Sequence, residues 1–111
     1  MTDLSSYQAN FSLTGRCALV TGSSAGLGLE IARAYAAHGA HVILHGRNAS
    51  KLRPLAEELK AAGAQVDTWE HDLADLDSLP DSYQTLCQRV GTPDILVNNV
   101  GVRLRSRLQD A

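Results

Sequence analysis

Three glycines follow directly after a short apolar run near the start of the chain. The run Cys17-Ala18-Leu19-Val20 leads into Thr21-Gly22-Ser23-Ser24-Ala25-Gly26-Leu27-Gly28. A glycine at a strand end permits a tight turn, and its missing Cβ lets a phosphate approach the backbone. A helix that begins there offers unpaired N–H groups and a partial positive charge to a pyrophosphate. The stretch predicts a pyrophosphate-binding turn, to which the serine hydroxyls add donors; the alternative is a glycine turn without a ligand.

The spacing of these glycines separates them from two commoner motifs. Gly22, Gly26 and Gly28 form the pattern G-x-x-x-G-x-G, which differs from the G-x-G-x-x-G dinucleotide fingerprint. No Gly-Lys-Ser/Thr sequence follows, so the stretch is not a P-loop. A predicted strand before it and a predicted helix after it favour a dinucleotide site.

A second candidate contact lies at the end of the next apolar run, in His45-Gly46-Arg47-Asn48. An NAD-preferring site of this kind places an Asp or Glu about 20 residues beyond the glycines, where it binds the ribose hydroxyls. Gly46 and Arg47 stand there instead, and a guanidinium pairs with a 2′-phosphate. This favours NADP as the ligand; the alternative for Arg47 is a solvated loop arginine.

Two further candidates follow later apolar runs. Asn98-Asn99-Val100-Gly101 comes directly after one run, and Asp72 comes shortly after another. In open α/β sheets, ligands bind at the carboxyl ends of the strands, so both are predicted at one rim. The Asp72 carboxylate could accept a hydrogen bond from an adenine amino group; the alternative is that it caps the helix that follows.

Four short apolar runs are the candidate strands that position these residues. They cover residues 18–20, 42–44, 65–69 and 95–97. The first, second and fourth are continuously apolar, which is expected of strands buried on both faces. The third alternates apolar with polar residues and is rich in β-formers, so we expect it nearer a sheet edge.

Three helical patterns lie between the strands. Apolar residues recur at helical spacing over 27–35, 52–59 and 79–90, and each pattern stops before a glycine, Gly39, Gly63 or Gly91. We expect Pro54 in the first turn of the second helix, where a missing N–H costs little. The order β-α-β-α-β-α-β predicts an α/β fold with a parallel sheet and helices on both faces.

The composition limits the classes of protein. With 111 residues, 44% hydrophobic and 20% charged, the chain fits one globular domain. A net charge of -2 indicates neither a nucleic-acid nor a membrane partner, and Arg103, Arg105 and Arg107 are too few to predict a polyanion site. Cys17 and Cys87 lack CxxC spacing, which favours buried thiols in a reducing compartment. No signal peptide is visible, so we expect a cytoplasmic protein, and we assign no metal ligands.

Together these motifs resemble the short-chain dehydrogenase/reductase family. They are TGSSAGLG at 21–28, GRN at 46–48, Asp72-Leu73 and NNVG at 98–101, and the likeness covers about residues 13–108. The stretches FSLTGRCALVTGSSAGLGLEIA, VILHGRNASKL and DILVNNVG are most similar to gluconate 5-dehydrogenase-like members, with β-ketoacyl carrier-protein reductases next. The resemblance implies the first half of a Rossmann-type doubly wound sheet in the strand order 3-2-1-4. It also implies hydride transfer between NAD(P) and a carbonyl or alcohol substrate, such as a sugar acid or polyol, in a homotetramer or homodimer.

The resemblance assigns residues to the cofactor NADP (NADPH). The pyrophosphate and ribose fall on Gly22, Ser24, Ala25, Gly26, Leu27 and Gly28. Ser23, Arg47 and Asn48 fall near the 2′-phosphate, Asp72 and Leu73 near the adenine, and Asn98, Val100 and Gly101 near the nicotinamide-side ribose. Val100 departs from the alanine usual in the family, and its side chain crowds the ribose.

The family's catalytic residues have no counterpart in the chain. They are a Ser, a Tyr-x-x-x-Lys pair and a later Asn, and the tyrosine, its pKa lowered by the lysine and the cofactor, exchanges the hydroxyl proton. Four residues after Tyr7, Tyr35 and Tyr83 stand Phe11, Gly39 and Cys87. We therefore assign no catalytic residue and expect residues 1–111 to be the N-terminal cofactor-binding part of one domain, inactive alone. The alternative from another class is a non-catalytic nucleotide-binding or interaction module.

Overall fold

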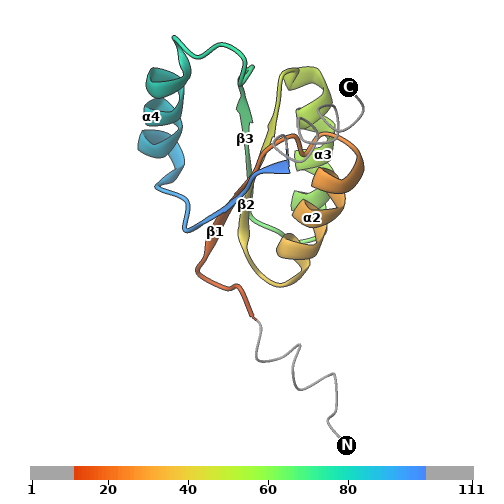
Figure 1. Ribbon diagram of the computed structural model, residues 1–111. Coiled ribbons are helices and arrows are strands. Elements are labelled where there is room, and N and C mark those ends of the chain that lie inside the picture. Colours follow the sequence, from red (N-terminus) through yellow and green to blue (C-terminus); the bar gives the residue numbers. More distant parts are fainter. Residues whose placement is uncertain (1–11, 100–111) are drawn as a thin grey trace, which may run out of the picture.

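Strands and helices alternate along the chain as the sequence predicts. The computed structural model describes residues 12–99. The strands are β1 (Cys17–Val20), β2 (His41–Gly46), β3 (Val66–Glu70) and β4 (Ile95–Val97); the helices are α2 (Gly26–Ala37), α3 (Ala49–Ala61) and α4 (Leu79–Val90). Figure 1 shows α2 and α3 on one side of the sheet and α4 on the other. This is the doubly wound arrangement predicted above.

The sheet is parallel and has the predicted order β3-β2-β1-β4. In register, Leu19 of β1 lies opposite Ile43 of β2 on one side and Leu96 of β4 on the other. Because all four strands run the same way, their carboxyl ends, and the loops that follow them, lie along one rim. The candidate residues after each strand therefore share that rim.

Each face of the sheet has its own hydrophobic cluster. Val42 and Leu44 of β2 pack with Leu52 of α3 in one cluster, whereas Ile43 packs with Leu86 of α4 in the other. Successive side chains of a strand point to opposite faces, so a central strand covered on both sides favours apolar residues at consecutive positions, here Val42, Ile43 and Leu44. This explains the continuous apolar run of β2.

The predictions for the two outer strands had different outcomes. The alternating strand β3 is at a sheet edge, as expected. The prediction that 95–97 is buried on both faces was wrong, because Leu96 is 65% exposed and Ile95 and Val97 are half-buried. Within residues 12–99, β4 pairs with β1 alone, so its apolar sequence is not matched by burial there.

The start of α3 also differs from the expectation. The helix begins at Ala49, after Asn48, whose side-chain Oδ1 accepts the Ser50 N–H at 3.0 Å. Pro54 consequently lies in the second turn, not the first, where it deprives the carbonyl of residue 50 of its helical hydrogen bond. The Asn48 cap extends the helix toward its N-terminus, beyond the apolar pattern that begins at Leu52.

The two cysteines are free thiols, as predicted, but they are half-buried, so the prediction that they are buried was wrong. Cys17 packs at the margin of the cluster under α4. Partial burial, and next the negative charge of Asp94, raise the pKa of the Cys17 thiol. A raised pKa keeps this thiol protonated and weakly nucleophilic.

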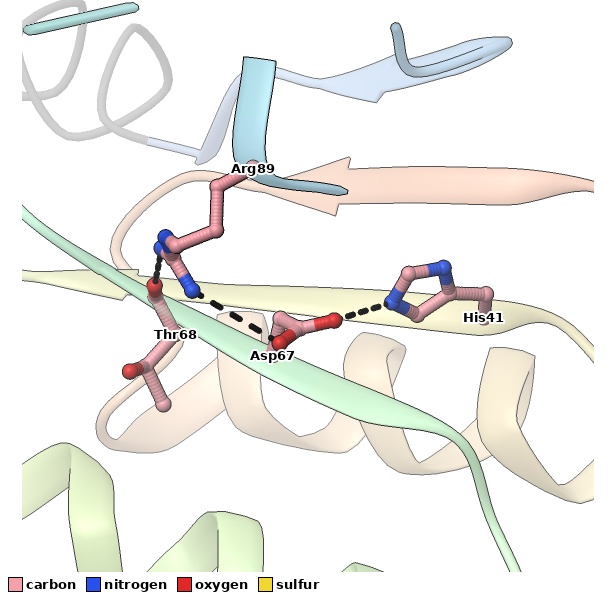
Figure 2. A network of polar contacts seen from close by, with 4 residues as sticks. All are labelled: His41, Asp67, Thr68 and Arg89. Atoms are coloured by element: carbon pink, nitrogen blue, oxygen red, sulfur yellow. Dashed lines mark hydrogen bonds and ion pairs between the residues drawn. The ribbon is translucent and has the colours of Figure 1, made fainter. Parts of the chain in front are cut away.

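A polar network covers the edge strand β3 on the α4 side of the sheet, toward the amino ends of the strands (Figure 2). The Asp67 Oδ2 atom lies 2.6 Å from Nε2 of His41, and its Oδ1 lies 3.6 Å from Nη1 of Arg89. The second terminal nitrogen of Arg89, Nη2, donates to the Thr68 carbonyl oxygen at 2.7 Å. Asp67 is thus the centre of a contact that joins β2, β3 and α4.

Replacing Asp67 by Asn should lower the free energy of unfolding by about 1 kcal/mol. The substitution keeps the shape but removes the charge that His41 and Arg89 share, and such partly exposed contacts have modest worth. Urea denaturation monitored by Trp69 fluorescence measures the change. The matched control is Glu58→Gln, because the Arg33–Glu58 pair is more exposed and its loss should cost less. Equal losses for both variants would contradict a special role for Asp67.

Candidate dinucleotide-binding site

The glycine loop makes a tight turn between β1 and α2. Gly22 and Gly26 have φ angles of 61° and 60°, a region that residues with a Cβ rarely adopt. At Gly28 a Cβ would stand 2.2 Å from the carbonyl oxygen of Gly22 and 2.9 Å from Nδ2 of Asn99. The turn therefore folds back onto the first turn of α2, and the missing side chain at Gly28 permits that approach.

The N-terminus of α2 carries no side-chain cap. Ala25 occupies the cap position with an extended backbone and no capping group, and the first turn contains no acidic residue. The first N–H groups of a helix lack intrahelical partners and carry a partial positive charge. Gly26 and Leu27 are exposed beside them. This end of the helix can therefore donate hydrogen bonds to an anion.

The structure places Ser23 beneath the loop, not at its surface. Its side chain is fully buried, and its Oγ accepts the His45 N–H at 2.8 Å, while its own N–H donates to the His45 carbonyl at 2.9 Å. The Ser23 hydroxyl is thus bonded to the end of β2 beneath the loop, and its expected position near a 2′-phosphate stays a prediction. Ser24 is half-buried, and its Oγ lies beside Gly46, 3.5 Å from where a Cβ would stand.

The end of β4 is tied to the same loop. The Thr21 hydroxyl donates to the Val97 carbonyl at 3.2 Å and accepts the Asn99 N–H at 3.0 Å. The Asn99 Nδ2 donates to the Gly22 carbonyl at 3.2 Å. Asn98 is exposed at this junction, with Oδ1 3.4 Å from the Thr21 hydroxyl. Val100 and Gly101, also predicted here, lie outside the described residues.

Arg47 and Asn48 follow β2 at the same rim. Arg47 is exposed and makes no hydrogen bond or ion pair with the residues at 12–99. Asn48 is exposed and caps α3. The Ala49 N–H donates to a carboxylate oxygen of Glu70 at 2.6 Å, so an acidic group does lie at the start of α3, contributed by β3 and not by the β2 end. The sequence spacing gave no signal for this contact.

Asp72 and Leu73 follow β3. The Asp72 Oδ1 accepts the Ala74 N–H at 2.9 Å and closes a turn. Ser78, not Asp72, occupies the N-cap position of α4, so the alternative that Asp72 caps the next helix was wrong. Leu73 is half-buried against the cluster under α4. The Asp72 carboxylate remains exposed at the rim.

Three residues that lie inside the predicted motifs but were assigned no contact of their own organise this site, namely Thr21, His45 and Asn99. His45 is 2% exposed, and its ring contacts both the Gly22 nitrogen and the His71 carbonyl. Thr21 and Asn99 belong to the TG and NN pairs of motifs already recognised. Their position inside those motifs could have indicated a role in the site. Their hydrogen-bond partners could not be predicted, because these depend on pairing between segments far apart in the sequence.

Within the described part of the chain, no group of three or more His, Cys, Asp or Glu side chains could hold a metal ion. No helix in residues 12–99 has the length and hydrophobicity needed to cross a bilayer.

A parallel sheet in this strand order, with a glycine turn after β1, defines a Rossmann-type nucleotide-binding fold. Comparison with protein families identifies the family within this class of fold. A profile described as short chain dehydrogenase matches residues 16–111. The chain belongs to the short-chain dehydrogenase family, whose members bind NAD or NADP.

Several members of the family are similar over most of this chain. Gluconate 5-dehydrogenase of Gluconobacter oxydans is 40% identical over 100 residues, which cover 90% of this chain and 39% of that protein. Galactitol 2-dehydrogenase (L-tagatose-forming) of Cereibacter sphaeroides is 41% identical over 106 residues, 95% of this chain and 39% of that protein. The chain thus spans about two fifths of the length of these relatives.

A solved structure has the same arrangement of elements. It is a gluconate 5-dehydrogenase from Burkholderia cenocepacia in complex with NADP and tartrate, and it superimposes with a TM-score of 0.78 at 38% identity. The match covers 84% of this chain and 36% of that one. At this identity the likeness extends to sequence as well as fold.

Proposed function

We propose that residues 1–111 form the N-terminal, cofactor-binding part of an NADP-dependent oxidoreductase. The observation that carries this proposal is the glycine loop, where the Gly22–Gly28 contact leaves no room for a side chain beside an uncapped helix N-terminus. Such a cradle fits a pyrophosphate. Membership of the short-chain dehydrogenase family supports the view that this pyrophosphate is part of a nicotinamide cofactor.

In the proposed complex, the residues around the loop hold the two ends of the cofactor. Gly22, Ser24, Ala25, Gly26, Leu27 and Gly28 would contact the pyrophosphate and ribose, with Asn98, Val100 and Gly101 near the nicotinamide-side ribose. Arg47 and Asn48 would face the 2′-phosphate. Asp72 would accept the adenine amino group, with Leu73 beside the ring. Ser23 would support the loop from below.

When bound, NADPH would supply a hydride, and the residues named above would hold and orient the cofactor. We assign no proton donor or acceptor among the residues of this chain, because no tyrosine has a lysine four residues later. We propose that the whole protein transfers hydride between NADPH and a sugar acid or polyol. The similarity to a gluconate and a galactitol dehydrogenase supports this substrate class. We also propose a homodimer or homotetramer, which light scattering would measure.

Titration of the full-length protein tests the cofactor. We expect tighter binding of NADPH than of NADH, because Arg47 can pair with the 2′-phosphate and no carboxylate follows Gly46 in its place. Isothermal titration calorimetry measures both affinities. Equal affinities would contradict the assignment of Arg47, and no binding of either dinucleotide would contradict the proposal as a whole.

A turnover assay tests the substrate class. With NADP⁺, we expect gluconate or galactitol to be oxidised faster than a hydroxysteroid, and a β-ketoacyl thioester serves as the second comparison, with NADPH. Faster turnover of the thioester would favour a ketoacyl reductase instead. Dinucleotide binding without turnover of any of these substrate classes would favour a non-catalytic binding module.

A further inference from the structure

The buried ring of His45 joins the glycine loop to the end of β3. The ring Nδ1 lies 2.9 Å from the Gly22 backbone nitrogen, and Nε2 lies 2.9 Å from the His71 carbonyl oxygen. Trp69 packs against the ring with centroids 5.1 Å apart. The ring is therefore held from both sides by backbone groups of different segments.

These two partners define the tautomer of the ring. A backbone N–H can only donate, so Nδ1 must accept the hydrogen bond of Gly22. A carbonyl can only accept, so Nε2 must carry the proton that faces His71. Protonating Nδ1 would place a second N–H group against the Gly22 N–H. The arrangement therefore requires a neutral imidazole.

The surroundings of His45 favour the neutral ring. Burial is the largest influence and lowers the pKa of His45; the hydrogen bond to the His71 carbonyl acts in the opposite direction. The His71 ring lowers the pKa of His45 further, and Asp72 raises it. The loop from Thr21 to Gly28 contributes no titratable side chain. The net effect is a ring that stays neutral to lower pH than an exposed histidine.

We propose that His45 is a positioning residue for cofactor binding, which fixes the Gly22 turn through its unprotonated Nδ1. Asn99 and the close contact with Gly28 hold the carbonyl of Gly22, and His45 holds its N–H. Both polar groups of one peptide residue are thereby fixed. The inference rests on the proposed function, because the proposed function names NADP as the ligand that the fixed Gly22 turn would bind.

The position of His45 also connects two parts of the proposed site. The residue pairs with Ser23 of the loop through backbone and hydroxyl hydrogen bonds, and Arg47 follows two residues later. A displacement of the His45 ring would therefore move the pyrophosphate turn relative to the turn that carries Arg47. Pre-organised donors bind an anion more tightly because less ordering remains to be done on binding.

Two substitutions separate the two hydrogen bonds of the ring. In His45→Asn, the amide oxygen occupies the place of Nδ1 and can accept the Gly22 N–H, but the contact with His71 is lost. In His45→Gln, the amide nitrogen reaches the place of Nε2 and keeps the His71 contact, but the Gly22 N–H is left without its acceptor. NADP⁺ affinity should stay within about threefold in the Asn variant and weaken about tenfold in the Gln variant.

The pH profile distinguishes positioning from plain support of the fold. We expect the wild-type affinity for NADP⁺ to be constant above the ordinary histidine pKa of about 6.5 and to fall at lower pH as the ring gains a proton. The Asn variant has no such group. The cofactor's 2′-phosphate titrates near pH 6 in both proteins, so the wild-type to variant affinity ratio cancels its effect.

The experiment uses the full-length protein, calorimetry with NADP⁺, and ¹⁵N spectra of the imidazole rings. We expect an Nε2–H tautomer of His45 and weakened NADP⁺ binding in the Gln variant but not in the Asn variant. We also expect the ratio of wild-type affinity to Asn-variant affinity to fall at low pH. His38→Gln is the matched control, because that exposed ring contacts the Ala34 carbonyl at the far end of α2 and should leave all three unchanged.

Two sets of outcomes overturn different statements. Wild-type protein that binds neither NADP⁺ nor NAD⁺ would overturn the proposed function and this inference with it. Tight binding by the wild-type and Gln proteins alike, an Nδ1–H tautomer, or a ratio independent of pH would overturn the inference alone. Thermal melts of each variant confirm that the compared proteins are folded.

Discussion

Gly28→Ala should abolish most dinucleotide binding and lower the free energy of unfolding by about 3 kcal/mol. Alanine is ordinarily better than glycine inside a helix by about 1 kcal/mol, so propensity alone predicts a gain. The new Cβ, however, would stand 2.2 Å from the Gly22 carbonyl oxygen. Backbone cannot rotate away as a flexible side chain does, and overpacking of this kind costs about 1–3 kcal/mol or more. The clash therefore outweighs the gain in propensity.

The loss of binding follows from the same displacement. Moving Gly22 by about 1 Å would break its contacts with His45 and Asn99 and misplace the loop, and misplacements of that size cost about a hundredfold in well-organised sites. Calorimetry with NADPH and urea denaturation measure the two effects. Gly63→Ala is the matched control: its φ of 97° makes alanine strained, but nothing lies within 4 Å and the site is distant in sequence from the loop. It should lose stability while retaining affinity. A Gly28→Ala protein with wild-type stability and affinity would show that the loop accommodates the Cβ.

Arg47→Ala should weaken NADPH binding about ten- to hundredfold and leave NADH binding unchanged. A charge-assisted contact with a phosphate contributes about 1.5–3 kcal/mol, which converts to that range. Arg47 is exposed and has no ion-pair partner among residues 12–99, so its removal breaks no described ion pair of the fold. The specific effect is therefore on the cofactor with the 2′-phosphate. Paired titrations with NADPH and NADH at low and high salt measure it, because screening should reduce the difference.

Arg53→Ala provides the matched control for Arg47. Arg53 is an exposed arginine of α3 that lines a groove beside the edge strand β3, together with Lys60 and Arg89. Removing it changes the net charge by the same amount, and Arg53 belongs to α3 itself and not to the turn that carries Arg47. Its affinity for NADPH should stay near that of the wild type. If both arginine variants lose affinity equally, the preference arises from overall charge and not from a contact with Arg47.

A complementary substitution at Glu70 would sharpen the same experiment. The Glu70 carboxylate accepts the Ala49 N–H at the start of α3, close in sequence to Arg47. Glu70→Gln removes a negative charge from this region, which would otherwise oppose a phosphate dianion. The NADPH preference should therefore increase in this variant. A decrease would mean that the carboxylate supports the turn more than it repels the phosphate.

The fold could be predicted from local patterns because each element is locally consistent. Continuous apolar runs identified β1 and β2, the alternation of 65–69 identified the edge strand β3, and glycines marked the helix ends. The start of α3 was predicted wrongly because two local sequence features there, a capping residue and an apolar pattern, indicate different first residues. The Asn48 cap moved the start of α3 ahead of its apolar pattern, so that Pro54 entered the second turn.

Burial was predicted less well than secondary structure. The run 95–97 is as apolar as β1, yet Leu96 is 65% exposed, because exposure depends on what covers a strand and not on the strand itself. The thiols of Cys17 and Cys87 were likewise expected to be buried and are half-buried. Apolar character measures what a residue can bury, whereas packing decides what it does bury.

The sequence by itself determined the order of elements, the position of the glycine turn after β1 and membership of the short-chain dehydrogenase family. These depend on propensities, spacing and motifs that are encoded within short segments. The tertiary structure alone decided that Ser23 is buried, that Asn99 holds the Gly22 carbonyl and that His45 holds the Gly22 N–H. Each of these contacts joins segments more than 20 residues apart, and they form because strand pairing in the sheet brings the loop ends together.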